Sequence, residues 1–334
     1  MSIRFTTTGM ALMSLLLVGA NLIGCTRSPE DDATGTRPNN TEQITVVTTT
    51  GMIADLVRAI GGDSVKVRSL VGVGVDPHLY KPTRDDIAAL LEAQIIFYNG
   101  HHLEGRMGEV LERAGKDRPV IAITESIPTV DLLHPDGLDE HPDPHLWLSP
   151  TLWGRCATPV VDELTRLKAA DGPVFKANQA RFIEQCATIE RSGREAIATI
   201  PAESRLLITS HDAFSYFGRA FDIKVMAIQG ITTESEAGLA DLEALVALVV
   251  KRRIPAVFVE SSVPRRSIEA LVEGAAAQGQ DVMIGGELFS DSMGPEGTPE
   301  GTWFGMIVHD IETVTRGLGG DAARISDVGA VLPR

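Results

Sequence analysis

The chain has 334 residues, of which 43% are hydrophobic and 22% are charged, and its formal net charge is −15. This length exceeds the usual size of a domain with a single core, so two lobes are expected in a soluble globular protein. An acidic balance of this size argues against nucleic-acid binding, because phosphate backbones are bound by patches of Lys and Arg.

The first 24 residues are predicted to be a lipoprotein signal peptide rather than part of the fold. Arg4 precedes an apolar run that is short for a membrane span and ends in small residues. The ending Leu22-Ile23-Gly24-Cys25 resembles the bacterial lipobox, in which the cysteine becomes the lipid-modified first residue. We therefore expect an exported chain with lipid on Cys25. The alternative is an ordinary signal peptide followed by an incidental cysteine.

Residues 25–43 are predicted to be a flexible tether. They are rich in Pro, Thr, Asn and acidic residues, and after Cys25 they contain no apolar residue larger than Ala33. Such a segment cannot bury enough apolar surface to fold by itself.

Two further cysteines, Cys156 and Cys186, lie in the part of the chain that is expected to fold. An exported protein could pair them, but the sequence does not fix their separation in space. We favour two buried free thiols.

From Ile44 onward, short runs of β-branched residues alternate with amphipathic helical patterns. The runs predicted as strands are residues 44–50, 65–71, 95–100 and 119–124. The helical patterns between them cover residues 52–62, 83–94 and 104–115. Thr83 is expected to cap the second helix, with Asp85 and Asp86 in its first turn. This alternation indicates βαβ crossovers and a mostly parallel sheet, in an N-terminal α/β lobe over residues 44–172.

The same alternation returns in the second part of the chain. The predicted strands are residues 205–210, 224–230, 256–260 and 281–286, and the predicted helices are residues 212–221, 235–253 and 265–279. The middle helix carries a single apolar stripe, made of Leu239, Leu242, Leu245, Val246 and Val249. A second four-stranded α/β lobe is therefore expected over residues 203–334.

The segment between the two lobes is predicted to be one long helix. Residues 174–199 contain no proline, their apolar residues recur at helical spacing, and Pro173 and Pro201 bracket them. A helix of this length is about 39 Å long. The predicted fold is thus α/β, with two four-stranded, mostly parallel sheet lobes flanked by helices and joined by one backbone helix within residues 173–202.

The tetrapeptide Asp-Pro-His-Leu occurs twice, and both copies follow predicted strands. His78 lies in a loop after strand 65–71, and His145 follows strand 119–124 just before Ser149-Pro150, an N-cap and N1 pair for the next helix. His211 and Asp291 follow strands of the second lobe. Ligands of open α/β sheets bind beyond the carboxyl ends of the strands, so these four side chains are expected to face a common cleft.

Three neutral imidazoles and one carboxylate form a complete ligand set for a divalent transition metal. The alternative for each residue is a surface or capping role. A catalytic zinc would need an open coordination position and a nearby general base. The sequence contains no His-Glu-x-x-His, no Gly-x-Ser-x-Gly and no Gly-x-x-x-x-Gly-Lys motif. We therefore expect a protein that carries a metal and is not an enzyme, with a zinc-dependent hydrolase as the competing class.

Several segments resemble, in order, the metal-binding solute receptors of bacterial ABC importers, cluster A-I or solute-binding protein family 9. These segments are "GVDPHLYKPTRDD", "DPHLWLSP", "LLITSHDAFSYFGRAF", "VFVESSV" and "GGELFSDSMGPEGTPEGTWFGMIVHDI". The resemblance covers about residues 44–318. It implies one divalent metal ion as cargo between two lobes, with His78, His145, His211 and Asp291 as ligands.

The resemblance also implies a partner and a location. We expect a monomeric receptor that is lipid-anchored to the bacterial membrane, periplasmic or at the cell surface, and that delivers its metal to an ABC permease. A second role as a metal-binding surface adhesin stays open.

The identity of the cargo is less sharply indicated. Position 211 is a carboxylate in some members, chiefly manganese receptors, and histidine in zinc receptors and mixed zinc/manganese members. The stretch "HPDGLDEHPDP" is short, with only His134 and His141, unlike the long histidine-rich loop of one zinc branch. Nitrogen-rich tetrahedral coordination favours Zn²⁺, with Mn²⁺ next and Fe²⁺ also open.

Three other histidines compete for a functional role. His101 and His102 end a turn after the third predicted strand, and His309 lies in a helical pattern. We expect solvated or supporting roles for the first two and a surface or packing role for His309.

Overall fold

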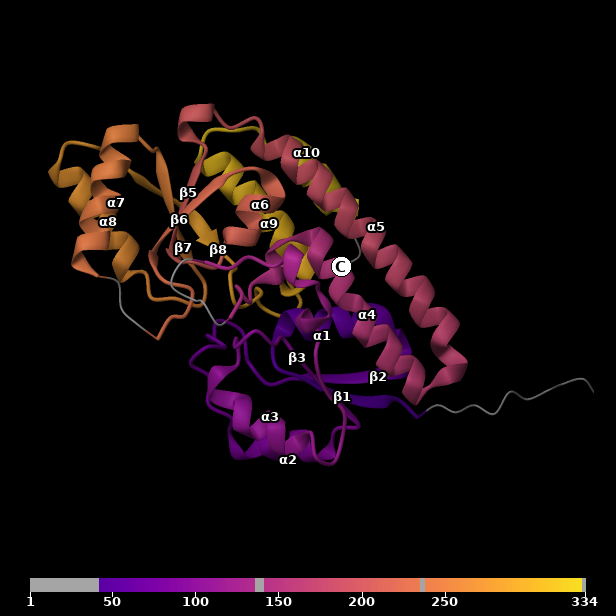
Figure 1. The fold of residues 1–334 in the computed structure, drawn as a ribbon. Helices are drawn as coiled ribbons and strands as arrows, with labels where there is room; N and C mark the ends of the chain where they lie inside the picture. The colour runs from indigo at the N-terminus through magenta and orange to yellow at the C-terminus, as the bar shows by residue number, and fades with distance from the viewer. Residues whose placement is uncertain (1–41, 136–140, 235–237, 332–334) are drawn as a thin grey trace, which may run out of the picture. The chain divides into compact units, whose positions relative to one another are not determined.

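The β-branched runs and the apolar-striped segments form the strands and helices of a computed structural model that describes residues 42–135, 141–234 and 238–331 (Figure 1). The predicted signal peptide of residues 1–24, Cys25 and nearly all of the predicted tether lie outside these described residues. We refer to residues 44–172 as the N-terminal half and to residues 203–334 as the C-terminal half.

The N-terminal half contains a parallel four-stranded sheet. Its strands are β1 (Ile44–Thr48), β2 (Val65–Ser69), β3 (Ile95–Tyr98) and β4 (Val120–Ala122), in the order β2-β1-β3-β4. Val46 of β1 packs in one core cluster with Ile95 and Phe97, whereas Val47 packs with Ile96 in another. Successive side chains of a strand point to opposite faces, so this sheet is buried on both sides. The predicted strands and their parallel arrangement are confirmed.

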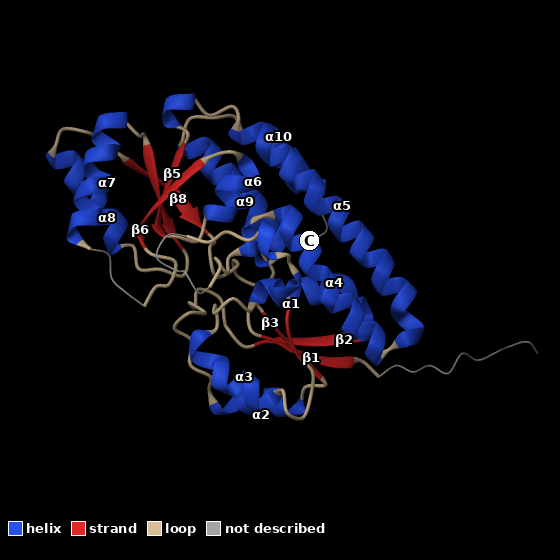
Figure 2. Cartoon of the chain, viewed as in Figure 1, coloured by secondary structure: helices blue, strands red, loops and turns tan. Residues whose placement is uncertain are grey.

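Helices cover both faces of this sheet (Figure 2). They are α1 (Gly51–Gly61), α2 (Arg84–Glu92), α3 (Gly108–Ala114) and α4 (Pro150–Leu167). The predicted cap of α2 is confirmed: the Thr83 hydroxyl accepts from the Asp86 amide at 3.3 Å, and an Asp86 carboxylate oxygen accepts from the Thr83 amide at 2.8 Å. Ser149 and Pro150 open α4 as predicted.

The C-terminal half has four strands that hydrogen-bond as two parallel pairs. They are β5 (Leu206–His211), β6 (Lys224–Gln229), β7 (Ala256–Glu260) and β8 (Met283–Leu288), paired as β5-β6 and β7-β8. The α/β class is confirmed, but the expected continuous four-stranded sheet is present as two pairs. β5 lies beside β7, and the His211 amide donates to the Glu260 side chain at 2.8 Å. A side-chain acceptor thus takes the place of a backbone carbonyl where the two pairs meet.

Helices α6 (Ser215–Phe221), α7 (Leu239–Arg252), α8 (Arg266–Ala277) and α9 (Trp303–Gly317) flank these strands, and α10 (Ala323–Val331) packs on α5 and α9. In Figure 2, α7 and α8 lie on one side of the strands, and α6 and α9 lie on the other. Leu245, Val246 and Val249 of the predicted stripe are buried. Leu239 was predicted to belong to the same stripe, but it is the first residue of α7 and is 72% exposed.

The long helix between the halves is α5 (Gly172–Ile197), with 26 residues. It begins and ends two residues earlier than predicted. It packs against α1 and α4 of the N-terminal half and against α9 and α10 of the C-terminal half (Figure 1). Cys156 and Cys186 are buried free thiols, as favoured from the sequence. Within the described ranges, no helix combines the length and apolar character needed to cross a membrane.

Candidate metal site

The two Asp-Pro-His motifs build the same local turn. The Asp76 carboxylate accepts a hydrogen bond from the His78 amide at 2.8 Å, and the Asp143 carboxylate accepts one from the His145 amide at 2.9 Å. A carboxylate that bonds to the backbone two residues further on is the usual way in which Asp stabilises a turn. The intervening proline fixes its own φ, so each motif holds its histidine on a rigid loop.

The other two candidates come from the C-terminal half. His211 is the last residue of β5, rather than the first residue after it. Asp291 lies in the loop that follows β8. All four side chains therefore lie at or beyond the carboxyl ends of parallel strands, where ligands of open α/β sheets bind.

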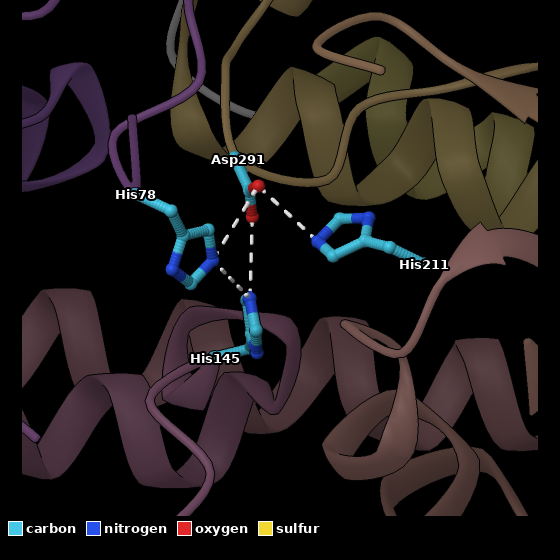
Figure 3. Close-up of side chains that lie close together, drawn as sticks. All are labelled: His78, His145, His211 and Asp291. Carbon is cyan, nitrogen blue, oxygen red and sulfur yellow. Dashed lines mark hydrogen bonds and ion pairs between the residues drawn. The ribbon is translucent and has the colours of Figure 1, made fainter. Parts of the chain in front are cut away.

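The structure brings the four predicted side chains together. One nitrogen or oxygen atom from each of His78, His145, His211 and Asp291 lies within 4.8 Å of the other three. Figure 3 shows the three imidazoles and the carboxylate pointing toward a common centre.

The separations suit a tetrahedral cation. His145 Nε2 lies 3.3 Å from Asp291 Oδ1, and His211 Nε2 lies 3.2 Å from Asp291 Oδ2. His78 Nε2 lies 3.4 Å from His145 Nε2 and 3.9 Å from Asp291 Oδ2. Bonds of the length found in zinc sites give tetrahedral edges of about 3.3 Å. The quoted separations of 3.2–3.9 Å, which run to both oxygens of Asp291, lie near or somewhat above this edge, so a small adjustment of the side chains would fit them around one cation.

Burial leaves these atoms without ordinary partners. His145 and His211 are 0% exposed, Asp291 is 1% exposed and His78 is 4% exposed. Three of these atoms have no hydrogen-bond partner in the described part of the chain: both carboxylate oxygens of Asp291 and the Nε2 atom of His211. Buried polar atoms in this state are rare and call for an explanation. A divalent cation bound by all four side chains would satisfy them together.

Two further carboxylates support the histidines, and the sequence interpretation missed both. Asp143 Oδ1 accepts a hydrogen bond from His145 Nδ1 at 2.8 Å, and Glu260 pairs with His211 Nδ1. Such carboxylates orient an imidazole and increase its basicity toward a metal. The signals were present: Asp143 belongs to the repeated motif, and Glu260 ends strand β7 at the carboxyl edge.

The same carboxylates control protonation of two imidazoles. Burial lowers the pKa of His145, but the hydrogen bond and charge of Asp143, with Asp291, outweigh it and raise the pKa to about 9. Burial likewise opposes protonation of His211, but Glu260 and Asp291 raise its pKa well above the usual value. In turn, burial disfavours the Asp291 carboxylate, yet the neighbouring His211 and His145 hold its pKa well below the ordinary range.

His78 behaves in the opposite way. Burial lowers its pKa to about 3, and the nearby Asp291 only partly opposes this effect. His78 therefore stays neutral across the physiological range, ready to coordinate, whereas His145 and His211 must first lose a proton.

The other histidines lie outside this group. His101 Nε2 is 3.3 Å from the Thr124 carbonyl oxygen, and the His102 ring stacks on His141 at 4.4 Å between centroids. His309 Nε2 is 2.9 Å from the Glu287 carbonyl oxygen, as expected for a packing role. The predicted lipidation residue, Cys25, lies outside the described residues.

Comparison with known proteins agrees with this architecture. Residues 46–317 match the family described as zinc-uptake complex component A, periplasmic (ZnuA). The chain is 43% identical over 277 residues to the manganese-binding lipoprotein MntA of Bacillus subtilis, covering 83% of this chain and 90% of that protein. It is 42% identical over 274 residues to the zinc-binding protein TroA of Treponema pallidum, covering 82% and 88%.

A solved structure gives the same result for the fold. The periplasmic zinc-binding protein TroA from Treponema pallidum superposes with a TM-score of 0.80 at 41% identity, covering 83% of this chain and 99% of that chain. The family match spans most of the chain, and the sequence identity to both relatives, above 40% over more than four-fifths of the chain, indicates a shared fold. The chain belongs to the ZnuA family of metal-binding solute receptors of bacterial ABC importers.

Proposed function

We propose that this receptor binds one divalent transition-metal ion through His78, His145, His211 and Asp291 and delivers it to an ABC permease. The observation that carries the proposal is the convergence of four buried ligand atoms within 4.8 Å of one another. Three nitrogens and one carboxylate oxygen are a ligand set that suits Zn²⁺ and its neighbours in the divalent series.

Zn²⁺ is the cargo that the ligand chemistry favours, and Mn²⁺ comes next. The two relatives differ on this point, since one is named as manganese-binding and the other as zinc-binding at nearly equal identity. Imidazole nitrogens in a tetrahedral arrangement bind zinc more strongly than manganese, which lies at the weak end of the divalent series. Metal availability in the compartment also decides which ion loads.

The two halves of the chain act as lobes in this proposal. Residues 44–172 and 203–334 supply two ligands each, and residues 173–202 connect them through α5. The contacts of α5 with helices of both halves support a rigid connection. A metal bound between the halves would link them and stabilise the folded state by mass action.

A closed set of four protein ligands favours transport over catalysis. A hydrolytic zinc keeps an open position for water, with a base beside it. Here all four corners are protein atoms, and the supporting carboxylates are engaged with His145 and His211. Family membership supports the receptor in the same way, and no observation on the described residues favours a hydrolase or an adhesin.

The anchor is part of the proposal. We infer that Cys25 carries lipid and that residues 26–43 tether a monomeric receptor near its permease; the relative MntA is itself named a lipoprotein. A Cys25→Ser variant should appear as soluble protein in the export compartment or the medium. Retention of that variant in the membrane fraction at the wild-type level would rule out the lipid anchor.

The transport role is tested in cells. A strain that lacks this receptor should take up radioactive zinc slowly, and a plasmid with the wild-type gene should restore uptake. His145→Ala should fail to restore it because the site loses one of four ligands, whereas the matched variant His309→Ala should restore it fully. Full restoration by His145→Ala would contradict the proposed site.

A further inference from the structure

The loop that carries Asp291 is held on both sides by the N-terminal half. Before Asp291, the Ser290 carbonyl oxygen accepts a hydrogen bond from the Trp147 indole N–H at 2.7 Å. After it, the Ser292 hydroxyl accepts one from the Gly74 amide at 2.7 Å. Both bonds join the two halves across the candidate metal site.

The two donors come from the loops that carry the first two histidines. Trp147 lies two residues after His145, and Gly74 lies four residues before His78. Gly74 has φ 71°, a left-handed conformation that glycine adopts without strain. Each histidine loop of the N-terminal half therefore holds one neighbour of Asp291.

Burial makes the Trp147–Ser290 bond difficult to exchange for water, whereas the Gly74–Ser292 bond is only partly buried because Gly74 itself is exposed. Trp147 is 1% exposed, Ser290 is 0% exposed and Ser292 is 5% exposed. Removing one partner of a buried hydrogen bond leaves the other polar atom unsatisfied, which costs more than the bond itself contributes. The Asp291 loop should therefore keep this position as long as both bonds are present.

The indole is itself fixed from a second direction. The Trp147 carbonyl oxygen accepts a hydrogen bond from the Trp303 indole N–H at 3.0 Å. Trp303, at the start of α9, is held in turn by its backbone amide, which donates to the Asp55 carboxylate of α1 at 2.9 Å. Trp147 thus has little freedom to move away from Ser290.

We propose that Trp147 and Ser292 are positioning residues that fix Asp291 against His78 and His145 before the metal arrives. This inference rests on the proposed function of the site. Three of the four ligands then form a preassembled unit, and the metal does not have to order the Asp291 loop when it binds. Preorganisation of this kind increases affinity because the ordering cost is met during folding.

His211 is held differently. Glu260, at the end of β7, accepts from the His211 amide at 2.8 Å and pairs with its Nδ1 atom. The fourth ligand is therefore positioned by the β5 and β7 strands, and its Nε2 atom lies 3.2 Å from Asp291 Oδ2.

The test compares two variants with two matched controls. Trp147→Phe removes the indole donor, and Ser292→Ala removes the hydroxyl acceptor. Trp153→Phe is the control for the first change, because the Trp153 indole nitrogen is buried without a hydrogen-bond partner among the described residues. Ser326→Ala is the control for the second, because it removes a hydroxyl acceptor on α10, where Ser326 accepts from Arg316 at 3.0 Å and takes no part in the metal site.

The readouts are the rate at which Zn²⁺ passes to an excess of chelator and the visible absorption of the Co²⁺-loaded protein. Loss of the indole donor should speed zinc release by about tenfold, the factor that a buried hydrogen bond supplies. It should also weaken the intense bands of four-coordinate Co²⁺, since a displaced Asp291 gives way to water. Ser292→Ala should act in the same direction, and both controls should match the wild type.

The outcomes separate this inference from the proposed function. A wild type that binds neither Zn²⁺ nor Co²⁺ contradicts the proposed function. A wild type that binds both, together with wild-type release rates and spectra in Trp147→Phe and Ser292→Ala, overturns the positioning role alone. Lower thermal stability with unchanged release and spectra would also overturn it, because the residues would then be purely structural. If Trp147→Phe does not fold, Ser292→Ala decides the question.

Discussion

The carboxylate of Asp143 accepts two hydrogen bonds from one residue, His145: one from the backbone amide at 2.9 Å and one from Nδ1 at 2.8 Å. A carboxylate can only accept, so the proton of the neutral imidazole must lie on Nδ1. The Nε2 atom is then free to coordinate, and it points toward Asp291 (Figure 3). Glu260 also contacts His211 twice: Oε1 accepts from the backbone amide at 2.8 Å, and Oε2 lies beside Nδ1 as an ion pair.

Replacing Asp143 with asparagine should weaken metal binding. The amide keeps the size of the side chain but loses the charge that orients His145, and loss of such a partner typically costs about 10-fold to 100-fold in affinity. Competition with a chromogenic chelator measures the change. Asp117→Asn, an exposed change of the same kind at the end of α3, should leave affinity unaltered. Equal affinities of Asp143→Asn and the wild type would show that this carboxylate does not support the ligand.

Metal binding should release protons even above neutral pH. In the metal-free protein the pKa of His145 is about 9, because Asp143 and Asp291 outweigh the effect of burial, and the pKa of His211 is raised as well. His145 is therefore mostly protonated at pH 8, the raised pKa of His211 acts in the same direction, and both imidazoles must be neutral to coordinate. Affinity should rise as the pH increases toward 9.

Calorimetry at pH 8 in two buffers of different ionisation enthalpy counts the released protons. A binding enthalpy that depends on the buffer, with a net release of protons, is the expected result. An enthalpy independent of the buffer would mean that the histidines titrate near the ordinary value of about 6.5.

The two halves should move only slightly when metal binds. The 26 residues of α5 form one helix that packs against helices of both halves, unlike a pair of extended hinge strands. X-ray scattering in solution should therefore give nearly the same radius of gyration for metal-free and zinc-loaded protein. A clear decrease on loading would indicate a wide hinge closure.

Cys156 and Cys186 should be unreactive in the native protein. Both are 0% exposed, and burial raises the pKa of each thiol, so little thiolate is available to react. A Cys25→Ser variant has Cys156 and Cys186 as its only cysteines, so it should react with a thiol reagent only after unfolding and should then show two thiols. No thiol after unfolding would reveal a disulfide instead.

The sequence predicted the strands, the long helix and the four candidate ligands, because each depends on local patterns. His78, His145, His211 and Asp291 were indicated by their positions at strand ends, but His101 and His102 also follow a strand, and only the family resemblance separated the four from these two. The supporting contacts could not, because they depend on how separate segments meet. The bond from Trp147 to Ser290 joins residues 143 positions apart, and nothing in either segment indicates it.

The pairing of the C-terminal strands could not be predicted from the sequence, because it also depends on how separate segments meet. The pattern identifies β5 to β8 as strands but not which of their edges are hydrogen-bonded. Here β5 and β7 lie side by side without a backbone ladder, and at their ends the Glu260 side chain accepts from the His211 amide.

The central claim is that four named side chains bind one metal ion, and titration calorimetry with elemental analysis tests it most directly. Zn²⁺ and Mn²⁺ are titrated into the metal-free wild type, the single alanine variants of His78, His145, His211 and Asp291, and the control His309→Ala. One equivalent of metal, with Zn²⁺ bound more tightly than Mn²⁺, is expected for the wild type and the control, and binding should be lost or greatly weakened in all four variants. Wild-type affinity in any of the four would contradict the assigned site, and tighter binding of Mn²⁺ would contradict the choice of zinc.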